Sequence, residues 1–174
     1  IEITGVEPVV LVEPLKALRK MGAGLRIFGA AGPKARIRMV MERRPAGITI
    51  DTGPYPGFPT DLQSVFLAAE ASGTGESQIR ETVYEARFEA AVRLASFGAD
   101  VSVHGDTAII KGRYPLLPGV VETPDLRGGA ALLVAALSAG GLSVVSDRGH
   151  LKRGYEDIVR DLRILGADIE ENIL

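Results

Sequence analysis

The chain has 174 residues, of which 46% are hydrophobic and 24% charged, and this balance predicts a single globular unit with a substantial core. Its net charge of −2 excludes a general attraction to nucleic acid or to an anionic membrane. Because cysteine is absent and the two histidines stand far apart, disulfides, zinc-thiolate sites and a cysteine nucleophile are excluded within this chain, and we expect no metal site.

Residues 1–46 read as an incomplete structural unit. The opening residues, IEITGV, predict a strand and not a signal peptide, and no apolar run approaches the roughly 20 residues that span a bilayer, so we expect a cytoplasmic protein. An amphipathic helix ends at Gly22, where a left-handed residue is favoured. The Gly-rich segment 29–35 lacks the ending of a phosphate loop and predicts a hairpin turn. Strands are expected on both sides of it, near 25–28 and 36–42.

Residues 47–118 read as a complete unit in which strands and helices alternate. Val101 and Val103 alternate with polar neighbours, which is typical of a half-buried strand, and the last two strands are expected to form an antiparallel hairpin. The expected helices cover residues 62–72 and 87–97, and the expected strands cover residues 47–51, 76–82, 100–104 and 107–112.

Residues 119–174 repeat this order, with a helix expected from Tyr155 and a strand in ADIEENI, but without a closing strand. Helices that end in Gly-Ala occur three times, in LKALRKMGAGLRI, FEAAVRLASFGADVSV and YEDIVRDLRILGADIEE. Helices that open on Asp-Leu occur twice, at Asp61 and Asp125. A shared period of roughly 65 residues indicates a repeated unit, which we interpret as βαβαββ in an α/β fold. Because unpartnered strands are costly, we expect the chain to be part of a longer protein.

Two aspartates at helix starts are candidate functional residues. Asp61 follows a loop stiffened by proline and glycine, PYPGFP, and we expect it both to cap its helix and to be able to accept a proton from a bound hydroxyl. The helix dipole lowers the pKa of such a carboxyl, so a substrate would have to be bound close to it. Asp125 stands beside Arg127, so a helix cap or an arginine-orienting role is expected there. The following pair, Gly128 and Gly129, indicates close packing or a nearby ligand.

Three arginines also lie near predicted helix starts, namely Arg87, Arg127 and Arg153. An arginine at this position is unfavourable on its own, because the N-terminal end of a helix carries positive charge. Guanidinium and helix dipole together would instead hold a phosphate or carboxylate group. The alternative is three surface salt bridges, for example between Arg153 and Glu156 or Asp157.

Four segments together resemble the UDP-N-acetylglucosamine enolpyruvyl transferase (1-carboxyvinyltransferase) family. They are PYPGFPTDLQ, ETVYEARF, PDLRGGAALLVAAL and KRGYEDIVRDLRILGADI. The resemblance implies one lobe of an inside-out α/β barrel built from βαβαββ units. The chain would correspond to the C-terminal part of the family's sequence and form one incomplete lobe, with residues 1–46 a partial repeat, 47–118 complete and 119–174 lacking its last strand. A second lobe, absent from this chain, would be its partner.

The family transfers enolpyruvyl from phosphoenolpyruvate to the 3-hydroxyl of UDP-N-acetylglucosamine and releases phosphate, in peptidoglycan precursor synthesis. By resemblance, Asp61 matches the base near that hydroxyl. Arg87 and Arg127 would face the carboxylate of phosphoenolpyruvate, and Arg153 its phosphate. No cofactor and no metal are implied. The family's general acid, usually a cysteine, and a lysine that contacts phosphoenolpyruvate fall in the missing lobe, so this fragment alone is expected to be inactive.

Two further positions match the family, and three positions differ from it. Val83 matches a residue that contacts the nucleotide sugar, and Asp125 matches the acid beside Arg127. The family usually has Asn, Thr and Asp where this chain has Ala86, Pro124 and Lys152. A non-catalytic paralogue that binds a nucleotide sugar or another anion therefore stays an alternative. The transferase acting on shikimate 3-phosphate is a further one, although PYPGFPTD and RGYE argue against it.

Overall fold

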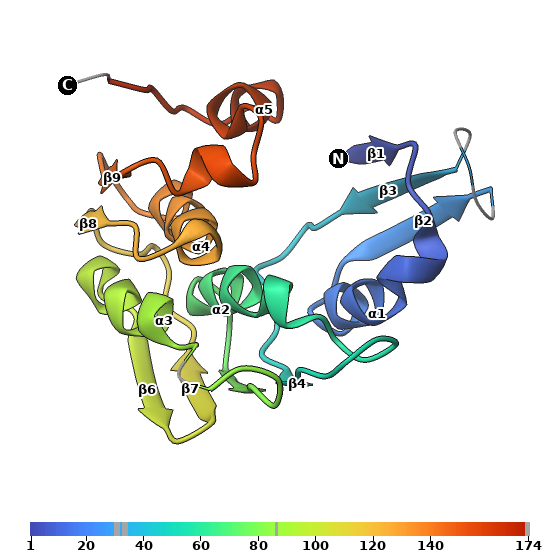
Figure 1. Cartoon of the computed structure of the whole chain (residues 1–174), viewed down its shortest axis with the longest axis horizontal. Coiled ribbons are helices and arrows are strands. Elements are labelled where there is room, and N and C mark those ends of the chain that lie inside the picture. Colours follow the sequence, from blue (N-terminus) through green and yellow to red (C-terminus); the bar gives the residue numbers. More distant parts are fainter. Residues whose placement is uncertain (30–31, 33–34, 86, 173–174) are drawn as a thin grey trace.

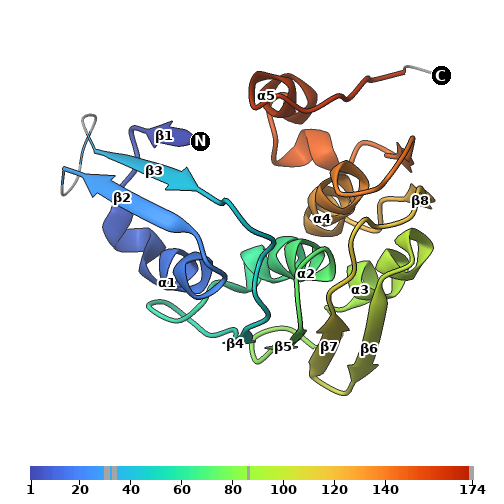
Figure 2. The same cartoon turned by 180° about the vertical axis from the view of Figure 1, so that it is seen from behind.

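The structure is a computed structural model that describes residues 1–29, 32, 35–85 and 87–172. Figure 1 and the reverse view in Figure 2 show most of the helices in the middle of the molecule with the strands around them, while the C-terminal helix, in red, lies at the top. Strands on the outside and helices on the inside are the arrangement expected for part of an inside-out α/β barrel. The predicted fold class is confirmed.

The first segment forms a three-stranded antiparallel sheet of order β1-β3-β2. Gly22 has φ of 105°, as predicted for the residue that ends the helix, and the predicted opening strand and hairpin are confirmed. Part of the turn predicted at 29–35 lies outside the described residues. The elements are β1 (Glu2–Thr4), η1 (Pro8–Leu11), α1 (Val12–Lys20), β2 (Gly24–Phe28) and β3 (Arg36–Val40).

The middle segment has the complete βαβαββ order that the sequence predicts. Its sheet has the order β4-β5-β7-β6, in which β4 and β5 are parallel and the other pairs antiparallel. Gly98, at the end of the second helix, is left-handed with φ of 70°. The elements are β4 (Thr49–Asp51), η2 (Thr60–Leu62), α2 (Gln63–Ala71), β5 (Glu76–Arg80), α3 (Glu89–Leu94), η3 (Ala95–Phe97), β6 (Asp100–His104) and β7 (Thr107–Lys111).

The last segment pairs β8 with β9 in parallel and corrects two predictions. Its second helix begins at Ile158 and not at Tyr155, because Asp157 caps it by accepting a hydrogen bond from the Arg160 amide at 2.8 Å. The strand expected in ADIEENI does not form in residues 167–172, where no neighbouring strand supplies ladder partners. The elements are β8 (Val120–Glu122), α4 (Leu126–Leu137), β9 (Val144–Ser146), η4 (Leu151–Arg153) and α5 (Ile158–Ile164).

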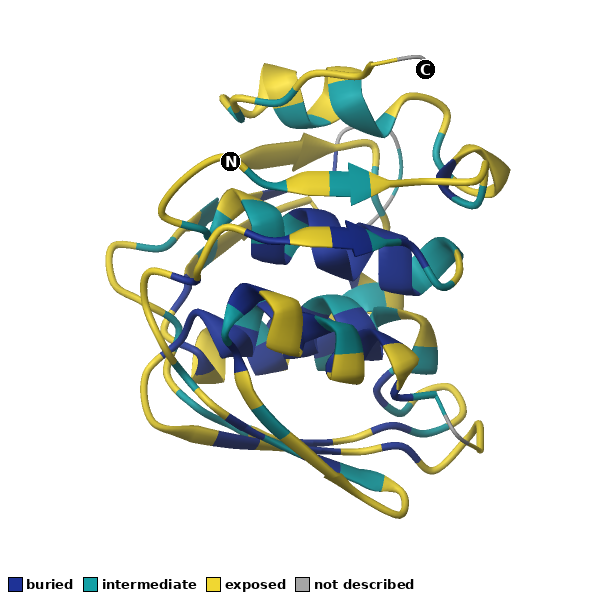
Figure 3. Cartoon of the chain, turned by 90° about the vertical axis from the view of Figure 1, so that its left-hand side faces the viewer, coloured by how far each residue is buried: buried dark blue, intermediate teal, exposed yellow. Residues whose placement is uncertain are grey.

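The core lies between α2, α3 and α4, whose small and branched side chains allow the helices to pack closely. Figure 3 shows these central helices largely buried, while the outer strands and α5 are mostly exposed. No helix in the described ranges is long and apolar enough to cross a bilayer. The largest fully buried apolar side chains are Met21, Leu67, Ile79, Leu94, Phe97, Ile110, Leu116 and Leu132.

A buried carboxyl group in α2 makes the stability of this core depend on pH. Glu70 is 1% exposed, and its Oε2 accepts a hydrogen bond from the Ser77 hydroxyl at 2.6 Å. Its Oε1 has no partner among the described residues. Burial raises the pKa of Glu70 to about 7, and the bond from Ser77 opposes this rise only in part.

Replacing Glu70 with glutamine should therefore stabilise the fold above neutral pH. Protonated Glu70 contributes stability that is full below its unfolded pKa and is lost as the pH rises through about 7. The difference between the pKa of about 7 in the folded protein and the ordinary value of 4.5 corresponds to at most about 3 kcal/mol of unfolding free energy. Urea unfolding at pH 5 and pH 8 should show wild-type stability falling with pH and the Glu70→Gln curve staying flatter. Equal pH dependence in the two proteins would show that Glu70 is not the cause of the loss of stability at high pH.

Candidate active site

The proline-rich loop before α2 is fixed at both of its ends. The Thr52 amide donates to the Arg80 carbonyl, and the Gly53 amide donates to the Phe58 carbonyl, both at 2.9 Å. Phe58 is buried and packs edge-to-face on Phe66 of α2, with ring centroids 5.0 Å apart. These contacts hold the segment that begins η2 against the core, and they fix the position of the residues at the start of α2.

Asp61 faces two arginines instead of capping its helix, so the predicted cap is wrong. It lies inside the 3-10 turn η2, where no side-chain cap hydrogen bond forms. Its Oδ1 is 2.6 Å from Nε of Arg127 and 3.4 Å from Nη1 of Arg87. The Asp61 side chain is 56% exposed, whereas those of Arg127 and Arg87 are 35% and 18% exposed. One exposed carboxylate is thus held between two half-buried cations, one just before α3 and one in the first turn of α4.

These contacts set the protonation of the site. The hydrogen bond from Arg127 lowers the pKa of Asp61; burial opposes this effect, and the charges of both arginines add to it. The pKa of Arg127 is raised in turn, chiefly by the same hydrogen bond. Asp61 is therefore ionised at neutral pH, but it is a weak proton acceptor while Arg127 stays on it.

Arg127 is placed by the first turn of α4. The Asp125 carboxylate accepts hydrogen bonds from the Arg127 and Gly128 amides at 2.8 and 2.9 Å, which confirms the cap predicted for Asp125. A Cβ on Gly128 would lie 2.6 Å from the Pro124 ring, and one on Gly129 would lie 3.0 Å from Leu151. The glycine pair therefore serves close packing of α4, the first of the two alternatives.

Arg87 precedes α3 and is held from two sides. Its Nη1 is 2.5 Å from the Thr60 hydroxyl, and its guanidinium lies 4.4 Å from the centre of the Tyr84 ring. The cation–π contact and the hydrogen bond fix the guanidinium plane close to Asp61. The helix itself begins at Glu89, so Arg87 is positioned by its loop and not by the first turn of α3.

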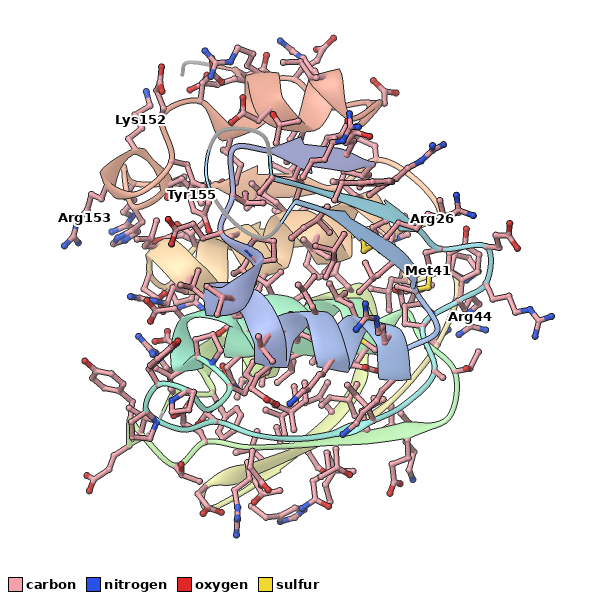
Figure 4. All side chains as sticks on the ribbon, turned by 90° about the vertical axis from the view of Figure 1, so that its right-hand side faces the viewer. Arg26, Met41, Arg44, Lys152, Arg153 and Tyr155 are labelled. Atoms are coloured by element: carbon pink, nitrogen blue, oxygen red, sulfur yellow. The ribbon has the colours of Figure 1, made fainter. Side chains whose placement is uncertain are left out.

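Arg153 lies apart from this group, and Val83 belongs to the loop beside it. Figure 4 shows the Arg153 side chain extending from the edge of the molecule. Within the described residues its guanidinium makes no ion pair; Glu156, one of its expected partners, lies 3.9 Å from Arg160. Val83 is exposed and lines a hollow of about 330 Å³ together with Tyr84, Phe88 and Asp106, among others. The structure thus joins Asp61, Arg87 and Arg127 but does not bring Arg153 to them.

Residues 1–162 match the family model described as EPSP synthase (3-phosphoshikimate 1-carboxyvinyltransferase). The chain belongs to the EPSP synthase family. It is 39% identical over 168 residues to a UDP-N-acetylglucosamine 1-carboxyvinyltransferase of Thermotoga maritima, and 42% identical over 170 residues to one of Coprothermobacter proteolyticus. The matches cover 97% and 98% of this chain but 39% of each relative, so the chain spans about two fifths of their length.

Solved structures of EPSP synthase family members share this fold. The enolpyruvyl transferase NikO from Streptomyces tendae superposes with a TM-score of 0.81 at 30% identity, over 97% of this chain and 39% of NikO. An EPSP synthase from Acinetobacter baumannii reaches a TM-score of 0.80 over 99% of this chain and 42% of its own. At 20% identity, the latter likeness concerns the fold alone.

Two of the three positions that depart from the sequence pattern are described, and neither contacts the charged group of Asp61, Arg87 and Arg127. Pro124 packs on Gly128 at the start of α4, and Lys152 lies 3.6 Å from Glu171. Ala86 lies outside the described residues. Across the part of the chain that the structure describes, no three His, Asp or Glu side chains are grouped as they would be around a metal ion.

Four further residues belong to this site and were not predicted from the sequence. The Thr60 hydroxyl donates a hydrogen bond to Glu81, and the ring of Tyr84 lies under the guanidinium of Arg87. Tyr155 is close enough for its pKa to respond to the charges of Arg127 and Asp61. Burial is the main cause that raises the pKa of Tyr155. Only Glu81 carried a usable signal, because an acidic residue directly after an alternating strand needs a partner when it is buried.

Proposed function

We propose that the complete protein transfers enolpyruvyl from phosphoenolpyruvate to the 3-hydroxyl of UDP-N-acetylglucosamine and releases phosphate, in peptidoglycan precursor synthesis in the cytoplasm. The proposal is carried by one observation: an ionised carboxylate lies between two arginines that come from separate repeats. The names of the relatives at 39% and 42% identity support this substrate pair over shikimate 3-phosphate.

The chemistry needs a base and fixed cations close together. The sugar oxygen forms a bond to C2 of phosphoenolpyruvate, the bond from C2 to the phosphate oxygen breaks, and the hydroxyl proton must leave. In our proposal Asp61 accepts that proton, while Arg87 and Arg127 bind the negative charge of phosphoenolpyruvate. Asp125 holds Arg127 in place through the cap of α4.

The pairing of Asp61 with Arg127 is weak enough to be exchanged for a substrate. A solvent-exposed ion pair contributes about 0–1 kcal/mol, and the Asp61 side chain is 56% exposed, while a dianion carries more negative charge than this carboxylate. An arriving dianion would thus compete successfully for the arginines. Once Arg127 has turned to the anion, the main cause that lowers the pKa of Asp61 is removed, and the carboxylate becomes a better base.

Other parts of the site remain proposals. We propose that Arg153 binds the phosphate group after a movement of η4, and that Val83 contacts the nucleotide sugar from the hollow beside Tyr84. We also propose the division into residues 1–46, 47–118 and 119–174 as parts of one lobe. A second lobe outside this chain would supply the general acid.

The test is a product assay on the complete protein with phosphoenolpyruvate and either acceptor. We expect phosphate release that depends on UDP-N-acetylglucosamine, and enolpyruvyl-UDP-N-acetylglucosamine as the product. Turnover with shikimate 3-phosphate instead would reassign the acceptor. Binding of the nucleotide sugar without any phosphate release would favour the non-catalytic paralogue.

A further inference from the structure

A buried carboxylate beside the proposed site is saturated with hydrogen bonds from three segments. Glu81 directly follows β5 and is 4% exposed. Its Oε1 accepts from the Thr52 hydroxyl at 2.8 Å and from the Val83 and Tyr84 amides at 2.9 and 3.1 Å. Its Oε2 accepts from the Thr60 hydroxyl at 2.7 Å. The group thereby ties the end of β4, the start of η2 and the loop that carries Arg87 to one point.

The charge of Glu81 sets the direction of the bonds around it. Burial would raise the pKa of Glu81, but the bonds from Thr60, Thr52 and the two amides together outweigh this effect and hold the pKa below its usual range. An ionised carboxylate can only accept hydrogen bonds. The Thr60 hydroxyl must therefore give its single proton to Glu81, which leaves its lone pairs for the guanidinium of Arg87.

Arg87 receives its orientation from groups that Glu81 holds. Its Nη1 donates to the Thr60 hydroxyl at 2.5 Å, and its guanidinium lies over the ring of Tyr84, whose amide bonds to Glu81. Both contacts would loosen if Glu81 were neutral or moved, because Thr60 could then turn its proton toward Arg87. A short, directed connection runs from Glu81 through Thr60 to Arg87.

We propose that Glu81 is a positioning residue that orients Arg87 toward the anionic substrate through the hydroxyl of Thr60. This inference rests on the proposed function for its kinetic consequence but not for its geometry. Glu81 itself is buried and does not touch the substrate in this account. Its effect should appear in the binding of the anion and not in that of the nucleotide sugar.

The test uses Thr60→Val in the complete protein, because valine keeps the size of threonine but loses the hydroxyl. We expect the KM for phosphoenolpyruvate to rise about 10-fold, as one hydrogen bond to a charged group is lost, with kcat within about 2-fold of wild type. Thr60→Ser should restore KM, since it keeps the hydroxyl. Glu81→Gln should raise KM in the same way, because its one carbonyl oxygen is needed by Thr52 and the two amides, which leaves the donor NH2 group facing Thr60.

Thr52→Val is the matched control, because Thr52 donates to the same carboxylate but does not contact Arg87. It should lower thermal stability and leave the KM for phosphoenolpyruvate unchanged. Equal rises in KM for Thr52→Val and Thr60→Val would overturn the proposal and leave Glu81 a structural residue only.

A second measurement separates this proposal from the proposed function. Nitrogen-15 NMR of the Arg87 guanidinium reports how fast its Nη groups rotate, and it needs no turnover. Rotation should be slow in the wild type and in Thr52→Val, and several-fold faster in Thr60→Val and Glu81→Gln. If wild type does not turn over phosphoenolpyruvate, the proposed function fails, and this comparison still decides the role of Glu81. Rotation that is the same in all four proteins would overturn it.

Discussion

Replacing Asp61 with asparagine in the complete protein is expected to lower kcat by about 10²- to 10⁴-fold, the usual contribution of a positioned acid or base. Asparagine has nearly the same shape but cannot take the hydroxyl proton. The nucleotide sugar should still bind, because the fold of the loop depends on Phe58, Phe66 and backbone hydrogen bonds and not on this carboxylate. Phosphate release and isothermal titration with UDP-N-acetylglucosamine would measure the two effects separately.

Asp51→Asn provides a matched control for this change. Asp51 makes a similar exposed ion pair, 2.9 Å from Nε of Arg80, on the outer sheet. Asp51→Asn should leave kcat unchanged, because the Asp51 side chain contacts no residue of the proposed site. Turnover close to wild type in Asp61→Asn would refute the base assignment, and an equal loss in both variants would point to a general effect of charge on folding.

Replacing Arg127 with alanine is expected to raise the KM for phosphoenolpyruvate by about 10- to 150-fold, the equivalent of one charge-assisted hydrogen bond. The same replacement should also change the pH dependence of kcat/KM. Arg127 is the main cause that lowers the pKa of Asp61, so its removal should raise that pKa. Because Asp61 must be ionised to act as a base, the acidic limb of kcat/KM should move to higher pH.

Two variants make this prediction specific. Arg127→Lys keeps the charge but not the planar fork of donors, so its KM should lie between those of the wild type and the alanine variant. Arg148→Ala removes another exposed ion pair, 2.8 Å from Glu122, and should leave both KM and the pH profile as they are. An unchanged acidic limb in Arg127→Ala would show that this arginine does not control Asp61.

The sequence was sufficient for elements whose pattern is local. The strand at 100–104 was predicted with its observed bounds, because Val101 and Val103 alternate with polar residues and Gly98 ends the preceding helix. The antiparallel pairing of the last two strands of the middle segment was also predicted, and it is observed between β6 and β7. The strand near the C-terminal end was wrong because a strand also needs a neighbour, which a local pattern cannot show.

The site was predicted less completely, because its geometry depends on contacts distant in sequence. The residue types Asp61, Arg87 and Arg127 could be selected from their places in the repeat. That Asp61 would bond to Arg127 and not to its own helix depends on how α2 packs beside α4. Glu81 escaped notice because its four partners come from three segments that only the folded chain brings together.

The most direct test of this account is a crystal structure of the complete protein with UDP-N-acetylglucosamine and inorganic phosphate. The quantity to measure is the distance between the Asp61 carboxylate and the 3-hydroxyl of the sugar. We predict a hydrogen bond of about 2.6–3.2 Å, with Arg87 and Arg127 turned to the phosphate. A structure in which Asp61 stays paired with Arg127 while the hydroxyl and the phosphate bind elsewhere would contradict the account.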